Sequence, residues 1–381
     1  MNGEKVEMRI GVDARSLSEP ITGIGRYTLS LLEVMVLDKS HQWVLYSHRP
    51  LLHGNWSKKN ITVHTWNLPK WARILRMLWA QSALPLMAKK DEVDLFWSPS
   101  HRLPRYLPNS IVSVVTIHDL VWKHAPETMR LFSQKLDAKF MPEAIRMADK
   151  VIAVSKWTAN DLITEVPEAE VKTSVIYEAN SLKLSDLIDF DKVDGEYILF
   201  VGTLEPRKNL PRLLQAYALL SKTIRDKHPL VIVGGKGWGK DNIYSIIEQL
   251  SISKHVKVLG YLSDEELASV YHQSHLFVMP SLYEGFGLPL LEAMSMGVPV
   301  VTSNISSLPE IVGDNAVIVD PNNVESIKDG IEKVLIDNEL RNQLSKAGLD
   351  RAKLFSWKGA AKETLAVFEE ALFFVNAGLN R

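Results

Sequence analysis

The stretch from Ser281 to Pro299, SLYEGFGLPLLEAMSMGVP, constrains the fold of this chain more than any other part. The apolar run HLFVMP before it (275–280) predicts a buried parallel strand. Pro289 suits the first turn of a helix, because its missing N–H would be unpaired there in any case. The glycines between strand and helix predict a loop whose N–H groups, together with the helix dipole, attract a phosphate.

Two carboxylates flank this predicted anion site: Glu284 just before the loop, and Glu292 one turn inside the helix. Carboxylates accept hydrogen bonds from hydroxyls, and a nucleotide sugar carries hydroxyls on both sides of its diphosphate. A nucleotide-sugar site is therefore one interpretation. The other is an ordinary strand–helix unit with two solvated glutamates, and the spacing alone leaves both open.

The composition excludes several classes of function. A length of 381 residues with 46% hydrophobic residues suits a globular chain of two domains, and the net charge of −1 gives no sign of nucleic-acid binding. The absence of cysteine excludes disulfides, thiol catalysis and Cys-ligated zinc. Residues 1–8 do not resemble a secretory signal, and no apolar run reaches the ~20 residues of a membrane helix. We therefore expect a cytoplasmic protein.

Strands and helices alternate along the chain, which predicts an α/β fold with parallel sheets. Residues 1–182 are predicted to form a first Rossmann-like domain, 183–195 a linker and 196–356 a second Rossmann-like domain. The amphipathic C-terminal helix, 357–381, is expected to cross back to the first domain. The predicted strands are 8–13, 42–47, 61–66, 93–97, 111–117, 150–154, 172–177, 197–201, 230–233, 256–259, 275–279, 298–301 and 316–319.

A second glycine-bearing loop is predicted after the first strand. It contains Gly23, Gly25 and Arg26, and the next helix is expected from about Tyr27. A dinucleotide fingerprint needs a third glycine where this chain has Thr28, so NAD binding is disfavoured. Approach of the backbone to an anion, helped by Arg26, and a plain turn both remain open.

Polar side chains follow two further predicted strands. His118 comes directly after 111–117, at the edge where α/β sheets bind ligands, and is interpreted either as a ligand contact or as a loop histidine. After 197–201, Arg207 and Lys208 stand where a helix begins and would clamp a diphosphate.

Two motifs are set aside. Asp189 and Asp191 match the DxD by which some sugar transferases hold a metal, but they lie in the charged linker, so no metal is expected there. The run GGKGWGK at 234–240 lacks the Ser or Thr of a phosphate-binding P-loop and is interpreted as a turn.

The segment 70–89 is a candidate membrane surface. It has no acidic residue, it carries Lys70, Arg73 and Arg76, and Pro85 should kink or end its helix. Contact with anionic lipid is one interpretation; packing of the stripe on the domain's own sheet is the other. The stripe with helical spacing is Trp71, Leu75, Leu78, Ser82 and Leu86.

Taken together, the motifs resemble the retaining GT-B glycosyltransferases of the family-4 type, also called glycosyl transferases group 1. The resemblance rests on EGFGLPLLEAM around Glu284, GTLEPRKN at 202–209, SLPEIVGDNAVIVDP at 307–321 and the FSW before the final helix. It implies two Rossmann-like domains with an interdomain cleft. It also implies metal-independent transfer of a hexose from a nucleoside-diphosphate sugar, with retention at the anomeric carbon.

The resemblance implies donor contacts in the second domain. Glu292 should hold the ribose hydroxyls and Glu284 the donor hexose, while Arg207 and Lys208 clamp the diphosphate. The resemblance also implies that the glycine loop, Gly285, Phe286, Gly287 and Leu288, contacts the phosphates through its backbone amides. Tyr261 and Leu262 should lie beside the nucleotide base.

In the first domain, His118 should lie beside the transferred sugar, and Gly23 and Gly25 should close over the donor. The predicted catalytic residues are therefore His118, Glu284, Arg207 and Lys208.

The sequence departs from the family in two places. Many members have Arg where this chain has Thr203, so the clamp rests on Arg207 and Lys208 alone or on Arg26 as well. Many also carry a Pro-Asn-Gly turn where this chain has YEAN at 177–180.

The expected function is transfer of a hexose, from UDP-glucose or GDP-mannose, to a saccharide or lipid-linked saccharide in polysaccharide or cell-envelope glycan synthesis. Peripheral contact of 70–89 with the inner face of the plasma membrane is the accompanying hypothesis, and no nucleic-acid partner is expected. Two rivals remain: a nucleotide-sugar epimerase of the same architecture and a non-catalytic sugar-binding protein.

Overall fold

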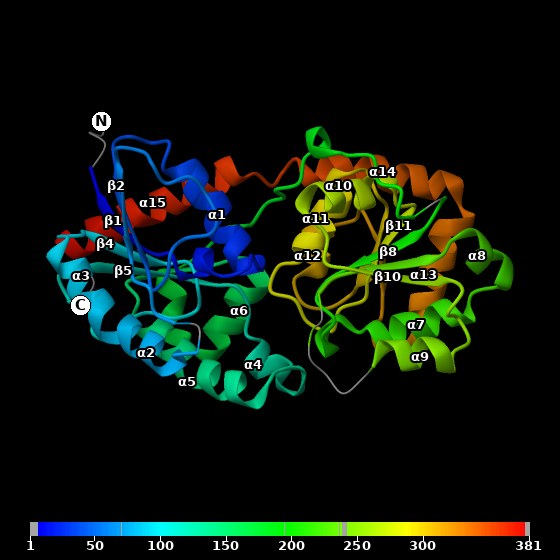
Figure 1. Ribbon diagram of the computed structural model, residues 1–381, viewed down its shortest axis with the longest axis horizontal. Helices are drawn as coiled ribbons and strands as arrows, with labels where there is room; N and C mark the ends of the chain where they lie inside the picture. The colour runs from blue at the N-terminus through cyan, green and yellow to red at the C-terminus, as the bar shows by residue number, and fades with distance from the viewer. Residues whose placement is uncertain (1–6, 70, 194, 236, 238–241, 378–381) are drawn as a thin grey trace. The chain divides into compact units, whose positions relative to one another are not determined.

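The computed structural model divides into two compact units (Figure 1). Unit 1 comprises Met1–Leu120, Lys135–Glu178 and Ser356–Arg381, and unit 2 comprises Val121–Gln134 and Ala179–Phe355. The residues that the structure describes are 7–69, 71–193, 195–235, 237 and 242–377.

Unit 1 is built on a seven-stranded parallel sheet with the order β3-β2-β1-β4-β5-β6-β7. Its central strands are buried on both faces, as expected of apolar strands covered by helices. The strand order reverses between β1 and β4. The strands are β1 (Arg9–Asp13), β2 (Gln42–Ser47), β3 (Ile61–Thr65), β4 (Leu95–Ser98), β5 (Val112–Ile117), β6 (Lys150–Ala153) and β7 (Thr173–Val175).

Unit 2 is built on a six-stranded parallel sheet with the order β10-β9-β8-β11-β12-β13. Here the order reverses between β8 and β11. The two parallel sheets predicted from the alternation are thus confirmed. The strands are β8 (Ile198–Val201), β9 (Leu230–Val233), β10 (Val256–Gly260), β11 (Leu276–Met279), β12 (Val300–Ser303) and β13 (Val317–Val319).

The helices fill the connections between strands. Those between β1 and β7 are α1 (Gly23–Met35), α2 (Arg73–Leu78), α3 (Leu84–Lys90), α4 (Val121–His124), α5 (Leu131–Met147) and α6 (Lys156–Glu165). Those from β8 onward are α7 (Leu210–Leu219), α8 (Lys222–Lys227), α9 (Ile243–Gln249), α10 (Asp264–Gln273), α11 (Leu288–Ser295), α12 (Leu308–Val312), α13 (Val324–Ile336), α14 (Asn338–Ala352) and α15 (Trp357–Asn376).

One local prediction was wrong. Gly23 and Gly25 do not lie in a loop, because α1 already begins at Gly23 with Thr22 as its cap. The Thr22 hydroxyl accepts the Gly25 N–H at 3.4 Å, and the Arg26 N–H donates to the Thr22 carbonyl at 2.8 Å. Glycine is tolerated there because first-turn N–H groups have no partner within the helix.

The C-terminal helix α15 belongs to unit 1, as predicted, and packs on α1, β5 and β6 (Figure 1, red). Its Phe368 is fully buried, with its ring centre 5.8 Å from that of Trp97. Lys150 of β6 donates to Glu370 at 2.7 Å. Both ends of the chain therefore contribute to the core of unit 1.

The segment 70–89 is not one helix. α2 and α3 are joined by a π-helical turn, Trp79–Ala83, just before Pro85. Proline cannot donate the i→i−4 bond, so the regular α-helical hydrogen bonding is interrupted at Pro85. The predicted stripe is largely exposed: Trp71 by 84%, Leu75 by 51%, Leu78 by 58% and Leu86 by 69%. Its packing on the sheet, the alternative interpretation, is therefore wrong for these side chains.

Candidate active site

The loops that follow β8 and β11 lie together, since these strands are neighbours at the point where the strand order of unit 2 reverses. Ligands of open α/β sheets bind at the carboxyl ends of strands at such a point. The Leu282 N–H donates to the Arg207 carbonyl at 2.8 Å, and the Asn209 amide donates to the Pro280 carbonyl at 2.9 Å. These hydrogen bonds fix the positions of the two loops relative to each other.

Glu284 lies at the centre of this arrangement, only 6% exposed. Its Oε1 accepts from Lys208 Nζ at 2.6 Å and its Oε2 from Arg207 Nη1 at 2.5 Å. Arg207 also donates through Nη2 to Glu205 at 2.5 Å. The predicted catalytic residues of the second domain therefore form a single ion-pair cluster.

The charge of Glu284 is fixed by its neighbours. Burial alone would raise the pKa of this carboxyl, but the adjacent Arg207 and Lys208 cations outweigh burial and lower the pKa to about 2. Glu284 is consequently a stable anion at neutral pH. It is a good acceptor for hydroxyl groups and a poor proton acceptor.

The backbone after Glu284 is held by two serines. The Glu284 N–H donates to Ser306 Oγ at 3.1 Å, and Ser307 Oγ lies within reach of the carbonyls of Glu284 (3.0 Å) and Phe286 (2.8 Å). Gly287 then adopts φ = 104°, and a Cβ at that position would lie 2.9 Å from Leu308. Only glycine suits this start of α11.

Glu292 is also buried, at 6% exposure, one turn inside α11. Its Oε2 accepts the Tyr271 hydroxyl of α10 at 2.9 Å. Among the described residues, no side chain caps the first turn of α11 at Gly287. An uncapped helix start attracts anions, so the anion site that the sequence predicted stays a prediction here.

The remaining residues that were predicted to contact the nucleotide sugar lie on neighbouring loops. Thr203 is exposed at the end of β8. Tyr261 follows β10 and is 71% exposed, whereas Leu262 is buried. A Cβ on Gly234, after β9, would lie 1.9 Å from the Gly202 carbonyl, so the loops after β8 and β9 touch backbone to backbone. The GGKGWGK run begins at this contact, and its residues 236 and 238–240 lie outside the described part of the chain.

In unit 1, His118 is buried and bound on both sides. Nδ1 lies 2.9 Å from Glu178 Oε1, and Nε2 lies 2.9 Å from the Pro99 carbonyl. Both neighbours are acceptors, so both ring nitrogens carry a proton. Burial alone would lower the pKa of His118, but the bonds to Glu178 and Pro99 raise it above its usual value. Tyr27 of α1 packs edge-on against the ring at 4.7 Å.

The sequence interpretation missed several residues that position this chemistry. Glu178 lies in the YEAN stretch that departs from the family pattern. Glu205 and Ser307 lie within the quoted motifs but were given no role, and Tyr271 and Ser306 act through tertiary contacts that no local pattern encodes.

In the described part of the chain, one trio has ligand atoms close enough to hold a metal ion: Glu196, His228 and His275, all within 4.8 Å of one another. These residues precede β8, β9 and β11, so they lie at the end of the sheet opposite to the loops described above. Lys227 pairs with Glu196 at 3.0 Å. Asp189 and Asp191 are not part of the trio.

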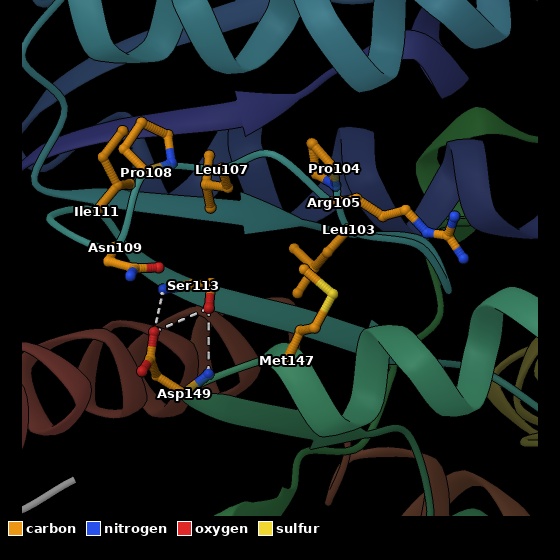
Figure 2. Close-up of a pocket in the computed structure, with 10 residues that line it drawn as sticks. All are labelled: Leu103, Pro104, Arg105, Leu107, Pro108, Asn109, Ile111, Ser113, Met147 and Asp149. Atoms are coloured by element: carbon orange, nitrogen blue, oxygen red, sulfur yellow. Dashed lines mark hydrogen bonds between the residues drawn. The ribbon is translucent and has the colours of Figure 1, made fainter. Parts of the chain in front are cut away.

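A cavity of about 280 Å³ in unit 1 also lies away from the carboxyl strand ends (Figure 2). It is lined mainly by apolar side chains from 103–111 and by Met147. At its wall, the Ser113 N–H and hydroxyl both donate to Asp149 at 2.8 Å (Figure 2). Ser113 is near the beginning of β5, so this cavity is not at the edge where sheets bind ligands.

No helix in the described residues is long and apolar enough to cross a membrane.

Comparison with known proteins identifies the family of this chain. Residues 189–351 match the model of glycosyl transferases group 1, and residues 21–179 match that of glycosyltransferase family 4. The chain is 32% identical to O-antigen chain mannosyltransferase B of Escherichia coli over 95% of its own length and all of that protein.

Solved structures share the fold. Sucrose-phosphate synthase of Thermosynechococcus elongatus superimposes with a TM-score of 0.77 at 19% identity, over 95% of this chain and 98% of that one. HepE of Anabaena, solved in complex with UDP and glucose, gives 0.71 at 18% identity, over 95% and 99% of the two chains. The relative from Escherichia coli and the two family models together show that this chain is a GT-B glycosyltransferase of the glycosyl transferases group 1 family.

Proposed function

We propose that this protein transfers mannose from GDP-mannose to a saccharide acceptor in the synthesis of O-antigen or a similar cell-envelope glycan, with retention at the anomeric carbon and without a metal. The observation that carries the proposal is the position of Glu284 between Arg207 and Lys208 beside the uncapped start of α11. The mannosyl specificity rests on the relative from Escherichia coli. UDP-glucose is the alternative donor.

The proposed chemistry follows from the charges. Departure of the sugar leaves a nucleoside diphosphate with additional negative charge, which Lys208, Arg207 and the start of α11 would stabilise. Glu284, held as an anion, would bind hydroxyls of the hexose. Its low pKa makes it a weak nucleophile, so we favour attack of the acceptor on the face that the phosphate leaves. The departing phosphate oxygen would then take the acceptor proton.

A thermal-shift comparison tests the donor. GDP and GDP-mannose should raise Tm more than UDP and UDP-glucose, because a ligand bound only by the folded state stabilises it by mass action. Glu292→Gln should weaken this shift. A larger shift with UDP-glucose would identify the alternative donor.

A transfer assay tests the reaction. Product formed from GDP-mannose and an alkyl mannoside should keep the α configuration by NMR, and dialysis against a chelator should leave the rate unchanged. A β product contradicts retention, and loss of activity on chelation contradicts metal independence. Conversion of the donor without acceptor would favour an epimerase.

We further propose that α2 and α3 rest on the cytoplasmic face of the membrane. Trp71, Leu75 and Leu78 are more than half exposed, Lys89 and Lys90 are exposed, and the segment has no acidic residue between 70 and 90. An exposed apolar stripe beside lysines complements anionic lipid.

Vesicle flotation tests the membrane surface. The double variant Leu75→Ser/Leu78→Ser should partition at least about tenfold less onto anionic vesicles, because two leucines no longer enter the lipid. The matched control Ile336→Ser/Leu354→Ser removes side chains that are 69% and 71% exposed on unit 2 and should not change partition. Equal partition of all three proteins would overturn the proposal.

A further inference from the structure

A second cavity of about 420 Å³ lies at the carboxyl ends of the first sheet. It is lined by Asp13 at the end of β1, Arg15 after β1, His48 after β2, Ser100 after β4, and Arg76 of α2. The strand order of unit 1 reverses between β1 and β4, so the cavity occupies the position where α/β sheets bind ligands. Its volume suits a small ligand.

Three guanidinium groups share two carboxylates around this cavity. Arg15 binds Asp13 through two nitrogens, at 2.7 and 2.6 Å. Arg49 and Arg76 both donate to the same Glu19 oxygen, each at 3.1 Å. The cluster therefore carries one more positive charge than negative charge.

Two buried nitrogen atoms beside this cluster lack a hydrogen-bond partner among the residues that the structure describes. Arg76 Nη1 lies 3.4 Å from His48 Nε2, which must accept that bond. Burial, with Arg15 and Arg76 nearby, lowers the pKa of His48 to about 4, so the ring is neutral and its single proton is on Nδ1. In the described structure, neither His48 Nδ1 nor Arg76 Nε has a hydrogen-bond partner. His48 is only 5% exposed, and two buried donors without acceptors are costly.

From this geometry we infer that the cavity binds a phosphate group of the acceptor, through Arg15 and Arg76, with Glu19 holding the guanidinium groups in place until the ligand arrives. A phosphate supplies the negative charge that would offset the excess positive charge of the cluster, and its oxygens match the paired N–H groups of guanidinium side chains. The inference rests on the proposed transfer to a saccharide. The phosphate could belong to a lipid carrier, since α2 bears both Arg76 and the exposed Leu75 and Leu78, or to a free sugar phosphate.

Binding of two probes tests the inference on the full chain. Mannose 1-phosphate and a short-chain prenyl diphosphate are titrated by calorimetry in the presence of saturating GDP, which blocks the phosphate site of unit 2. Arg76→Gln should weaken binding at least about tenfold, the usual effect of losing a hydrogen bond to a charged group. Glu19→Gln should tighten it, because a competing anion is removed. The control Arg146→Gln, whose side chain is 54% exposed and paired with Glu168, should change nothing.

The outcomes separate the possibilities. Tighter binding of the prenyl diphosphate identifies a lipid carrier, and tighter binding of mannose 1-phosphate identifies a free sugar phosphate. Absence of binding by the wild type, or weaker binding in Glu19→Gln, overturns the inference. In transfer assays, Arg76→Gln should raise KM about tenfold for a phosphate-bearing acceptor and leave KM for a neutral alkyl mannoside unchanged. Equal effects on both acceptors also overturn it, whereas absence of transfer in the wild type counts against the proposed function alone.

Discussion

Each unit holds a cluster of arginines and carboxylates at the carboxyl ends of its central strands, and the two clusters differ in how fully their charges are satisfied. In unit 2, each oxygen of Glu284 has its own cation, and Arg207 is shared with Glu205. In unit 1, Glu19 uses one oxygen for two arginines, and two buried donors near it have no acceptor in the part of the chain that the structure describes.

The difference separates two kinds of site. A closed cluster has fixed geometry, which favours stabilising charge that develops during a reaction without rearrangement. A cluster with an excess of positive charge favours a ligand that brings negative charge. We interpret the first as the donor site and the second as part of the acceptor site.

The largest effect is expected from Lys208→Ala, which opens the closed cluster. We expect kcat to fall about 10²-fold or more, as when one oxyanion donor is lost, because a cation beside the leaving phosphate is removed. Steady-state kinetics with GDP-mannose measures it. The control Lys222→Ala removes an amine that is 79% exposed and should leave kcat unchanged. Near-wild-type turnover of Lys208→Ala would contradict the assignment of Lys208 as a residue that binds the diphosphate.

The pH dependence of stability tests the charge of Glu284. Its pKa is about 2 in the folded protein and about 4.3 when unfolded, so at neutral pH its ionisation contributes about 3 kcal/mol. A lowered carboxyl pKa gives stability that is present above the unfolded pKa and is lost as pH falls toward the folded one. The stability difference between wild type and Glu284→Gln should therefore shrink from pH 5 to pH 3, measured by calorimetry. A difference independent of pH contradicts the ion-pair assignment.

Glu178→Gln is expected to lower the free energy of unfolding by a smaller amount, with the opposite pH dependence. The pKa of His118 is raised, so its contribution is present below the unfolded pKa and is lost as pH rises through the folded one. The variant should lose about 1.5–3 kcal/mol at pH 6, the value of a hydrogen bond to a charged group, and less at pH 9. NMR titration of His118 should show a lower pKa in the variant. An unchanged pKa would mean that Glu178 does not hold the imidazolium.

The sequence was informative wherever the pattern is local. Alternating strands and helices predicted both sheets, and the glycine loop before α11 was placed correctly. The start of α1 was placed too late, because the low helix propensity of Gly23 and Gly25 matters little in a first turn.

Long-range pairing could not be predicted. Arg49 and Arg76 reach Glu19 from 30 and 57 residues away, and Glu178 reaches His118 from 60. Nothing in the neighbouring sequence marks these residues as partners, since each pair is formed only when separate elements of the fold come together. The closed cluster was predictable because its residues fall in recognisable motifs, and the open one was not.

Calorimetric titration of GDP and UDP into wild type, Glu292→Gln and Arg76→Gln tests the division between the two sites most directly. The nucleotide that binds the wild type should bind Glu292→Gln at least about tenfold more weakly, through loss of a charged acceptor for the ribose, and should bind Arg76→Gln with unchanged affinity. Unchanged affinity in Glu292→Gln together with weakened affinity in Arg76→Gln would contradict the account and move the donor to unit 1.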